Sequence, residues 1–292
     1  MSPKLEGIVP AVVTPLSADG VFQPDIFARL LERVYTGGVH GVYVCGQTGE
    51  GMLQSVEQRE RVLEAALKYS PAGKLVIIHV GANATADAVA LARHAEQAGA
   101  HAISSLPPSG AYEFAEIREF YETLARSTSL PLLLYHHPDV CPQLTPDLAL
   151  ELCSIPNVAG FKFTDFNLYL LSLIRDRGKV VFNGRDEVLA AGLLMGATGG
   201  IGTFYNLFPA VFARIFALGQ EARWSEAAAL QRELNPVLER IFRFPLVPAV
   251  RVALAYAGLD CGECIAPRRR LAKEEVKEMH AILYGLSGEI RL

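Results

Sequence analysis

Residues 158–165, with the sequence VAGFKFTD, form the stretch that decides the fold. The apolar run 158–161 is typical of a buried strand, and the polar residues after it mark the strand's carboxyl end. A helical pattern over 167–176 and a second apolar run over 180–183 follow directly. This order of strand, helix and strand is typical of a parallel sheet. Lys162 is therefore expected where a strand of such a sheet ends.

The same alternation fills the first two thirds of the chain. Apolar or β-branched runs predict strands at 7–13, 41–45, 75–80, 102–106, 130–135, 158–161, 180–183 and 199–203. Helical spacing lies between them at 24–35, 56–68, 85–97, 113–125, 146–152, 167–176 and 187–195. Ser55, Thr145 and Asp186 are suitable helix N-caps at these boundaries. The pattern predicts a (β/α)8 TIM barrel, because the doubly wound alternative lacks its Gly-x-Gly-x-x-Gly turn after the first strand.

Helical patterns without further strands follow, at 208–218, 224–242, 247–257 and 273–284. We expect residues 1–220 to form the barrel and residues 221–292 to form a C-terminal all-helical extension. With 292 residues and 51% hydrophobic content, the chain can bury a core of this size.

The composition limits which kinds of binding partner and which cellular compartment are expected. The formal charge is -4, from 27 basic and 31 acidic residues, so no global positive field would attract nucleic acid or an anionic membrane. No run approaches the ~18 apolar residues of a membrane span, and Pro3 and Glu6 interrupt the place where a signal peptide begins its apolar core. A cytoplasmic protein is expected. Cys261 and Cys264 have the spacing of half a zinc site but no second pair, so no metal is expected.

Lys162 is the first candidate for chemistry, because TIM-barrel active sites lie at strand carboxyl ends. An ordinary lysine has a pKa near ~10.4, so about one in 10³ to 10⁴ molecules carries a neutral amine at pH 7. Burial among apolar groups lowers that pKa and makes the amine a nucleophile toward a ketone. The alternative is a solvated end-cap, whose stem lies on apolar surface while its ammonium reaches water.

Two other expected strands end in groups that suit this chemistry. The turn Gly46-Gln47-Thr48-Gly49-Glu50 can present backbone N–H groups and the Thr48 hydroxyl to a carboxylate. Tyr135 ends the strand at 130–135, and its phenol can shuttle protons. The alternatives are a glycine-rich turn without a further function and a core or rim aromatic.

Polar groups also follow the strands at 180–183 and 199–203. The first cluster consists of Gly184, Arg185, Asp186 and Glu187, although a helix cap explains Asp186 equally well. The second, which ends in Gly202 and Thr203, can cradle a phosphate or only permit close packing. An amine, a phenol, an anion-binding turn and polar contacts on one face together predict a keto-acid aldolase.

Three ordered motifs resemble those of the N-acetylneuraminate lyase and dihydrodipicolinate synthase superfamily of class I, pyruvate-dependent aldolases. They are Gly-x-Thr-Gly-Glu at Gly46 to Glu50, Tyr-x-x-Pro at Tyr135 to Pro138 and Gly-x-Lys at Gly160 to Lys162. The resemblance covers about residues 7–206 and, more weakly, the helical tail. It implies a lysine imine with the substrate, neither metal nor added cofactor, and a homotetramer built as a dimer of dimers.

The chain is more similar to the neuraminate lyase branch. The segments that carry this likeness are 78–81, 162–164, 183–187 and 200–203. The synthase branch typically holds its substrate carboxylate with an arginine two residues after the proline of the tyrosine motif, where Val140 stands here. Because nothing obvious replaces that guanidinium fork, the synthase alternative is weakened.

Three positions depart from the lyase pattern. Gln47 replaces the small hydroxyl residue that relays protons to the tyrosine, and an amide cannot cycle protons in that way. The family's second relay tyrosine, which comes across a subunit interface, is not aligned in 106–110, and Tyr112 replaces it only if the loop shifts. Arg185 stands where neuraminate lyases have tyrosine, which indicates a more acidic aldehyde or keto-acid substrate.

The resemblance implies that Lys162 attacks pyruvate or a larger 2-oxo acid, that the Thr48 turn holds its carboxylate, and that Tyr135 moves the proton. The remaining expected substrate contacts are Gly46, Gln47, Gly49, Thr164, Gly184, Arg185, Asp186, Glu187, Gly202 and Thr203. The second partner would be a small aldehyde. Four alternatives stay open: a dihydrodipicolinate synthase, an imine-forming sugar-acid dehydratase, a keto-acid-binding barrel without turnover, and a phosphate-binding barrel enzyme.

Overall fold

Eight parallel strands form the centre of the computed structural model, which describes residues 3–142, 144–288 and 290–292. They are β1 (Gly7–Pro10), β2 (Gly41–Val44), β3 (Leu75–His79), β4 (Ala102–Ser105), β5 (Leu132–His136), β6 (Val158–Phe163), β7 (Val180–Asn183) and β8 (Gly199–Gly202). Their order is β1-β8-β7-β6-β5-β4-β3-β2, and a parallel bridge between Ala11 and Tyr43 joins the two end strands. The predicted TIM barrel is confirmed.

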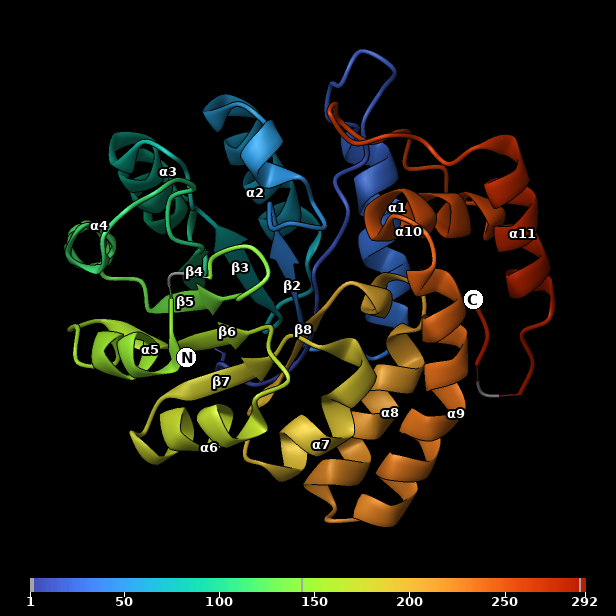
Figure 1. Ribbon diagram of the computed structural model, residues 1–292. Helices are drawn as coiled ribbons and strands as arrows, with labels where there is room; N and C mark the ends of the chain where they lie inside the picture. Colours follow the sequence, from blue (N-terminus) through green and yellow to red (C-terminus); the bar gives the residue numbers. More distant parts are fainter. Residues whose placement is uncertain (1–2, 143, 289) are drawn as a thin grey trace.

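Helices cover the outside of this sheet (Figure 1). They are α1 (Pro24–Thr36), α2 (Val56–Tyr69), α3 (Thr85–Ala98), α4 (Phe114–Arg126), α5 (Pro146–Leu152), α6 (Leu168–Asp176), α7 (Leu189–Leu194) and α8 (Pro209–Gln220). Because α8 packs on α1, α7 and β1, it completes the ring around the barrel. Helix α8 ends at Gln220, and the division of the chain at this residue stays a prediction.

Two of the three predicted helix caps are present. The Ser55 hydroxyl accepts a hydrogen bond from the backbone N–H of Gln58 at the start of α2, and Thr145 caps α5 in the same way. The cap interpretation of Asp186 is wrong, because α7 begins only at Leu189 and the Asp186 carboxylate bonds elsewhere. The carboxylate instead accepts a hydrogen bond from the backbone N–H of Phe204, a residue of the candidate active site.

Apolar side chains fill both the barrel interior and the layer between strands and helices. The interior cluster contains Val9, Ala11, Tyr43, Leu75, Ile77, Ala102, Leu133, Phe182 and Ile201. Phe161 and Phe163 of β6 belong to the outer layer. Because successive side chains of a strand point to opposite faces, Lys162 between them faces the interior.

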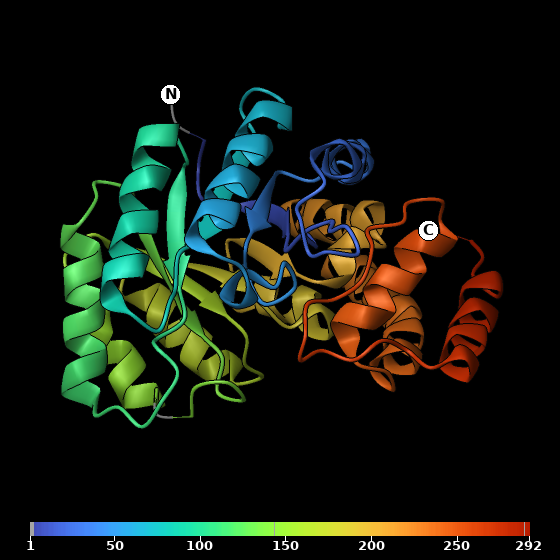
Figure 2. The same ribbon diagram turned by 90° about the horizontal axis from the view of Figure 1, so that it is seen from above.

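The C-terminal helices α9 (Trp224–Phe242), α10 (Leu246–Tyr256) and α11 (Lys273–Tyr284) lie on one side of the barrel in both views (Figures 1 and 2). A buried ion pair attaches this extension: Arg251 Nη2 lies 2.6 Å from Glu50 Oε1. Arg251 also donates to the carbonyl oxygens of Thr14 and Cys261. The predicted all-helical extension is therefore anchored to the turn that follows β2.

None of the helices in the described part of the chain combines the length and the apolar character that crossing a lipid bilayer requires.

Candidate active site

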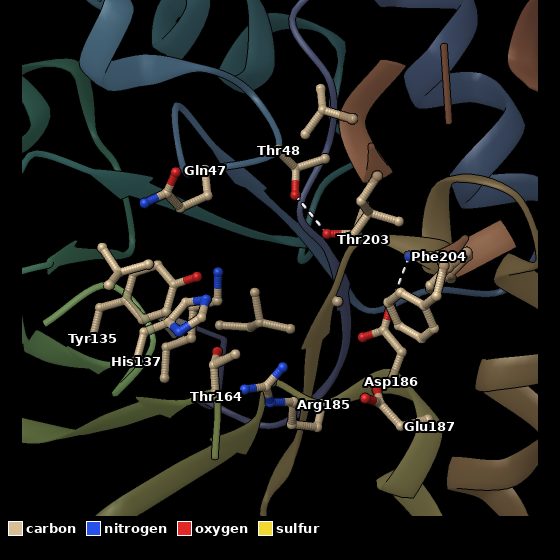
Figure 3. Close-up of a pocket in the computed structure, with 18 of the residues that line it drawn as sticks. Gln47, Thr48, Tyr135, His137, Thr164, Arg185, Asp186, Glu187, Thr203 and Phe204 are labelled. Carbon is tan, nitrogen blue, oxygen red and sulfur yellow. Dashed lines mark hydrogen bonds between the residues drawn. The ribbon is translucent and has the colours of Figure 1, made fainter. Parts of the chain in front are cut away.

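A cavity of about 240 Å³ lies at the carboxyl ends of the strands. Most of the predicted site residues line it, although they come from five different strands or their following loops. Those residues are Gln47, Thr48, Tyr135, Lys162, Thr164, Gly184, Arg185, Asp186, Glu187, Gly202 and Thr203. Figure 3 shows Tyr135, His137 and Thr164 on one side of the cavity and Asp186 and Glu187 on the other.

Lys162 reaches the cavity from β6, paired in register with Tyr135 of β5 and Phe182 of β7. The residue is 4% exposed. Its Nζ lies 3.9 Å from the centre of the Tyr135 ring and 4.4 Å from that of Tyr43. Burial lowers the pKa of Lys162 to about 7, and the charge of Asp186 only partly opposes this shift. The amine is therefore not a solvated end-cap, and it is poised to be neutral near physiological pH.

Tyr135 is buried beside this amine. Burial raises the pKa of its phenol far above the usual value, while the Thr164 hydroxyl and the charge of Arg185 act in the opposite direction. The resting phenol is thus protonated. A protonated phenol this close to the amine can donate its proton to an oxygen of a bound substrate.

In the turn after β2, the polar residues Gln47 and Thr48 line the cavity, whereas the glycines on either side of them do not. Thr48 Oγ1 lies 2.6 Å from Thr203 Oγ1, which links this turn to the end of β8 (Figure 3). Gly46 and Gly49 do not line the cavity. A Cβ atom on Gly46 would lie 2.4 Å from the Tyr43 ring, so glycine lets the turn pack against that ring.

Asp186 lies opposite the amine and is held by the neighbouring strand end. Its Oδ2 accepts a hydrogen bond from the backbone N–H of Phe204 at 2.7 Å. Its Oδ1 is buried and has no hydrogen-bond partner in the described residues, and a Cβ atom on Gly202 would lie only 1.9 Å from it. Burial raises the pKa of Asp186 to about 7, against the effect of the Phe204 N–H. Asp186 can therefore hold or release a proton inside the cavity.

Helix α9 fixes the loop that carries the two acidic residues. Gln231 donates to the carbonyl oxygen of Asp186 at 3.2 Å, and Asn235 donates to that of Glu187 at 3.0 Å. Burial raises the pKa of Glu187 as well. The helical extension thus positions site residues of the barrel.

The glycines of β8 permit close packing instead of cradling a phosphate. Gly199 to Gly202 pair with β1 on one side, and Gly199 and Gly200 pair with β7 on the other. A Cβ atom on Gly199 would lie 2.0 Å from the Gly7 carbonyl oxygen, and one on Gly200 would lie 2.2 Å from the Tyr205 hydroxyl. Because these residues belong to the sheet, the phosphate-cradle hypothesis for this segment is wrong.

Sequence reasoning missed part of the cavity wall. The missed lining residues include His137, Val140, Phe204, Phe242, Leu246, Val247 and Arg268. His137 lies within the Tyr-x-x-Pro motif, which was a usable signal. Burial lowers its pKa to about 4, so the ring is neutral at pH 7. Phe242, Leu246 and Arg268 come from the extension, where no local pattern indicates a site.

Tyr112 lies outside this cavity. It lines a separate surface groove together with Asn83, Pro108 and Glu116. Within one chain, the structure therefore does not bring this tyrosine to Lys162.

No three His, Cys, Asp or Glu side chains in residues 3–142, 144–288 and 290–292 gather closely enough to hold a metal ion.

The fold and the site together define a class of protein. A buried amine of lowered pKa, a phenol against it and a hydroxyl-bearing turn at the strand ends of a TIM barrel are the parts of a class I, lysine-dependent aldolase.

Comparisons with known proteins agree with this class. The chain matches the dihydrodipicolinate synthetase family over residues 4–285. It is 35% identical over 277 residues to an N-acetylneuraminate lyase of Rhizobium meliloti, covering 94% of this chain and 92% of that protein. It is 30% identical to that of an Enterobacter species, covering 99% of each. The structure of CdNal from Clostridium difficile in complex with mannosamine has a TM-score of 0.90 at 26% identity, covering 96% and 98% of the two chains.

The chain therefore belongs to the dihydrodipicolinate synthetase family. Within that family it is a neuraminate lyase-like class I aldolase, a pyruvate-dependent lyase.

Proposed function

We propose that Lys162 forms the imine with C2 of pyruvate or of a larger 2-oxo acid. The supporting observation is the burial of its amine between the rings of Tyr43 and Tyr135. With a pKa of about 7, half of the molecules carry a neutral amine at pH 7. An ordinary lysine would offer about one in 10³ to 10⁴. Burial therefore removes most of the cost of preparing the nucleophile.

The chemistry proceeds through the imine without another electron sink. The Lys162 nitrogen attacks the C2 carbonyl carbon. The carbonyl oxygen leaves as water after taking one proton from the attacking nitrogen and one from the Tyr135 phenol, which leaves the phenolate beside the iminium. Thr48 and the backbone of its turn hold the substrate carboxylate during this step, which keeps the carbonyl beside the amine. The resulting iminium carries the positive charge that the next step needs.

Tyr135 serves the carbon–carbon bond step in both directions. In cleavage, the phenolate takes the proton of the C4 hydroxyl, the C3–C4 bond breaks, and its electron pair moves to the iminium nitrogen to give an enamine. The iminium charge favours the phenolate that this direction requires. In synthesis, the enamine carbon attacks the aldehyde carbon and the phenol protonates the aldehyde oxygen. Gln47 holds the substrate but does not carry protons.

The substrate class follows from the opposite wall of the cavity. Asp186, Glu187 and Thr203 present oxygen atoms that can bind hydroxyl groups. The curated relatives are named N-acetylneuraminate lyases, enzymes of a hydroxylated 2-oxo acid. We therefore propose a 2-keto-3-deoxy sugar acid with a hydroxylated tail as the substrate, cleaved to pyruvate and an aldehyde or formed from them.

The assembly, the compartment and the cofactor requirement complete the proposal. We propose a cytoplasmic homotetramer, a dimer of dimers, that works without metal or added cofactor. Tyr112 lies in a groove outside the cavity of its own chain, so a role for this tyrosine in the proton relay requires a neighbouring copy. Light scattering gives the mass in solution, and turnover in the presence of a chelator tests the metal independence.

Borohydride trapping tests the imine directly. Wild-type protein incubated with pyruvate and borohydride should gain the mass of one reduced pyruvate adduct, located at Lys162 by peptide mapping. Lys162→Ala should gain none, whereas the control Lys277→Ala, at an exposed lysine of α11, should gain the full adduct. An adduct that survives Lys162→Ala would overturn the proposal.

A further inference from the structure

Arg185 occupies a distinctive place in the cavity wall. It follows β7, and Figure 3 shows its guanidinium directed into the space between Thr164 and Asp186. The side chain is 20% exposed, and its guanidinium carbon lies 4.6 Å from the centre of the Phe166 ring. This cation–π contact helps to hold the guanidinium at the cavity.

The donors of Arg185 are only partly used. Nη2 donates to Asp139 Oδ2 at 2.5 Å, while Nε is buried without a hydrogen-bond partner in the described residues. The side chain of Asp139 is 65% exposed. An ion pair with such an exposed partner contributes little stability, so an incoming anion can displace Asp139 at low cost. A planar guanidinium with a free edge is suited to bind a carboxylate through two hydrogen bonds.

The cavity also limits what kind of anion can bind there. Lys162 and the Thr48 turn hold the 2-oxo acid end of the substrate, so Arg185 faces the other end. A phosphate, with up to two negative charges, would lie near Asp139, Asp186 and Glu187 and would meet no loop of free N–H groups, because Gly199 to Gly202 are paired in the sheet. The cavity of about 240 Å³ lies below the ~300 to 1,000 Å³ of pockets for drug-sized ligands, which favours a short tail.

We propose that Arg185 selects a short acceptor aldehyde that carries a carboxylate at the end remote from its carbonyl. The carboxylate takes the place of Asp139 on the guanidinium and lies on the His137 side of the cavity, away from Asp186 and Glu187. Val140 in the same wall carries no charge, and the other guanidinium of the lining, that of Arg268, lies beside the buried carboxylate of Glu50. This inference rests on the proposed aldolase function and adds the chemistry of the second substrate.

A matched pair of acceptors tests the selection. Succinic semialdehyde and its methyl ester have the same aldehyde and chain, but only the acid carries a charge. With pyruvate as donor, wild-type kcat/KM should be about 10- to 100-fold higher for the acid, as expected for hydrogen bonds to a charged group. A second pair, glyceraldehyde 3-phosphate and glyceraldehyde, tests a phosphate in place of the carboxylate. Wild-type kcat/KM should be no higher for the phosphorylated aldehyde.

Substitutions test whether the Arg185 side chain causes the preference for the acid over its ester. Arg185→Met should lower kcat/KM for the acid about 10- to 100-fold and leave the acid and the ester equivalent. Arg185→Lys should restore only part of the preference, because an ammonium lacks the bidentate fork. Asp139→Asn should raise kcat/KM for the acid, since it removes the competing carboxylate. Arg223→Met, which removes the same charge from the exposed start of α9, is the matched control and should leave the preference intact.

Three results would overturn this inference. They are an equal wild-type kcat/KM for the acid and the ester, an equal loss of kcat/KM for both in Arg185→Met, and a clearly higher kcat/KM for the phosphorylated aldehyde. Turnover of neither acceptor would also contradict it. The pyruvate adduct is measured in parallel in each variant. A pyruvate adduct at Lys162 in the same samples shows that the imine mechanism stands even when the acceptor assignment fails.

Discussion

The two walls of the cavity are built in different ways. One wall consists of the ends of β2, β5 and β6, which carry Thr48, Tyr135 and Lys162. The opposite wall combines the loop after β7 with residues of α9 and α10, and Gln231 and Asn235 hold that loop in place. The reacting groups thus come from the barrel, whereas the groups facing the substrate tail lie at the junction with the extension. Changes in the first wall should affect chemistry, and changes in the second should affect recognition.

Among substitutions that leave the Lys162 amine in place, Tyr135→Phe should lower turnover the most. Loss of a positioned proton donor and acceptor typically costs ~10²- to 10⁴-fold, so kcat should fall by about that factor. The pyruvate adduct at Lys162 should still form, because the amine is untouched. Steady-state kinetics and borohydride trapping measure the two quantities. Tyr169→Phe, at a side chain 70% exposed on α6, is the control, and unchanged turnover in Tyr135→Phe would contradict the assigned role.

Glu50→Gln should weaken the attachment of the extension to the barrel. The buried Arg251 guanidinium would lose its charged partner at 2.6 Å, which typically costs about 3 to 5 kcal/mol of unfolding free energy. Denaturant titration measures this change. Glu221→Gln, which breaks an exposed ion pair with Arg223, should change the unfolding free energy little. Equal stabilities of the two variants would show that the buried pair does not hold the junction.

The two walls also differ in how far the sequence alone predicts them. Strand and helix periodicity is local, so the barrel, the extension and the positions of Lys162 and Tyr135 follow from short windows. The far wall depends on contacts between distant segments: Phe242 and Arg268 line the cavity although nothing near them in the sequence indicates a site. Asp186 was open to two interpretations, because only the fold brings the Phe204 N–H to its carboxylate.

Thr203→Val tests the link between the two walls. The variant removes the hydroxyl that lies 2.6 Å from the Thr48 hydroxyl while keeping the shape of the side chain. One hydrogen bond of this kind contributes ~1 kcal/mol, so KM for pyruvate should rise about 5-fold with a smaller change in kcat. Thr36→Val, outside the cavity at the end of α1, serves as the control. An unchanged KM would mean that Thr48 holds its position without this partner.

Asn235→Ala should give the smallest effect and only on the far wall. The substitution removes the donor to the Glu187 carbonyl, which loosens the acidic loop without touching its side chains. We expect KM for the acceptor or the sugar acid to rise about 2- to 3-fold, near the lower end of the hydrogen-bond range. The rate of adduct formation with pyruvate should not change. Glu233→Ala, on the exposed face of α9, is the matched control. A loss of adduct formation in Asn235→Ala would contradict the separate roles of the two walls, because it would show that the far wall also affects imine formation.

The pH dependence of adduct formation tests the central claim, that burial makes the Lys162 amine a nucleophile at neutral pH. Because the pKa of Lys162 is lowered to about 7, the amine is protonated below that pH and neutral above it. The rate of borohydride-trapped adduct formation at Lys162, at saturating borohydride and fixed low pyruvate, should rise with pH, reach half its maximum near pH 7 and then level off. A rate that keeps rising toward the ordinary lysine pKa of ~10.4 would contradict the claim.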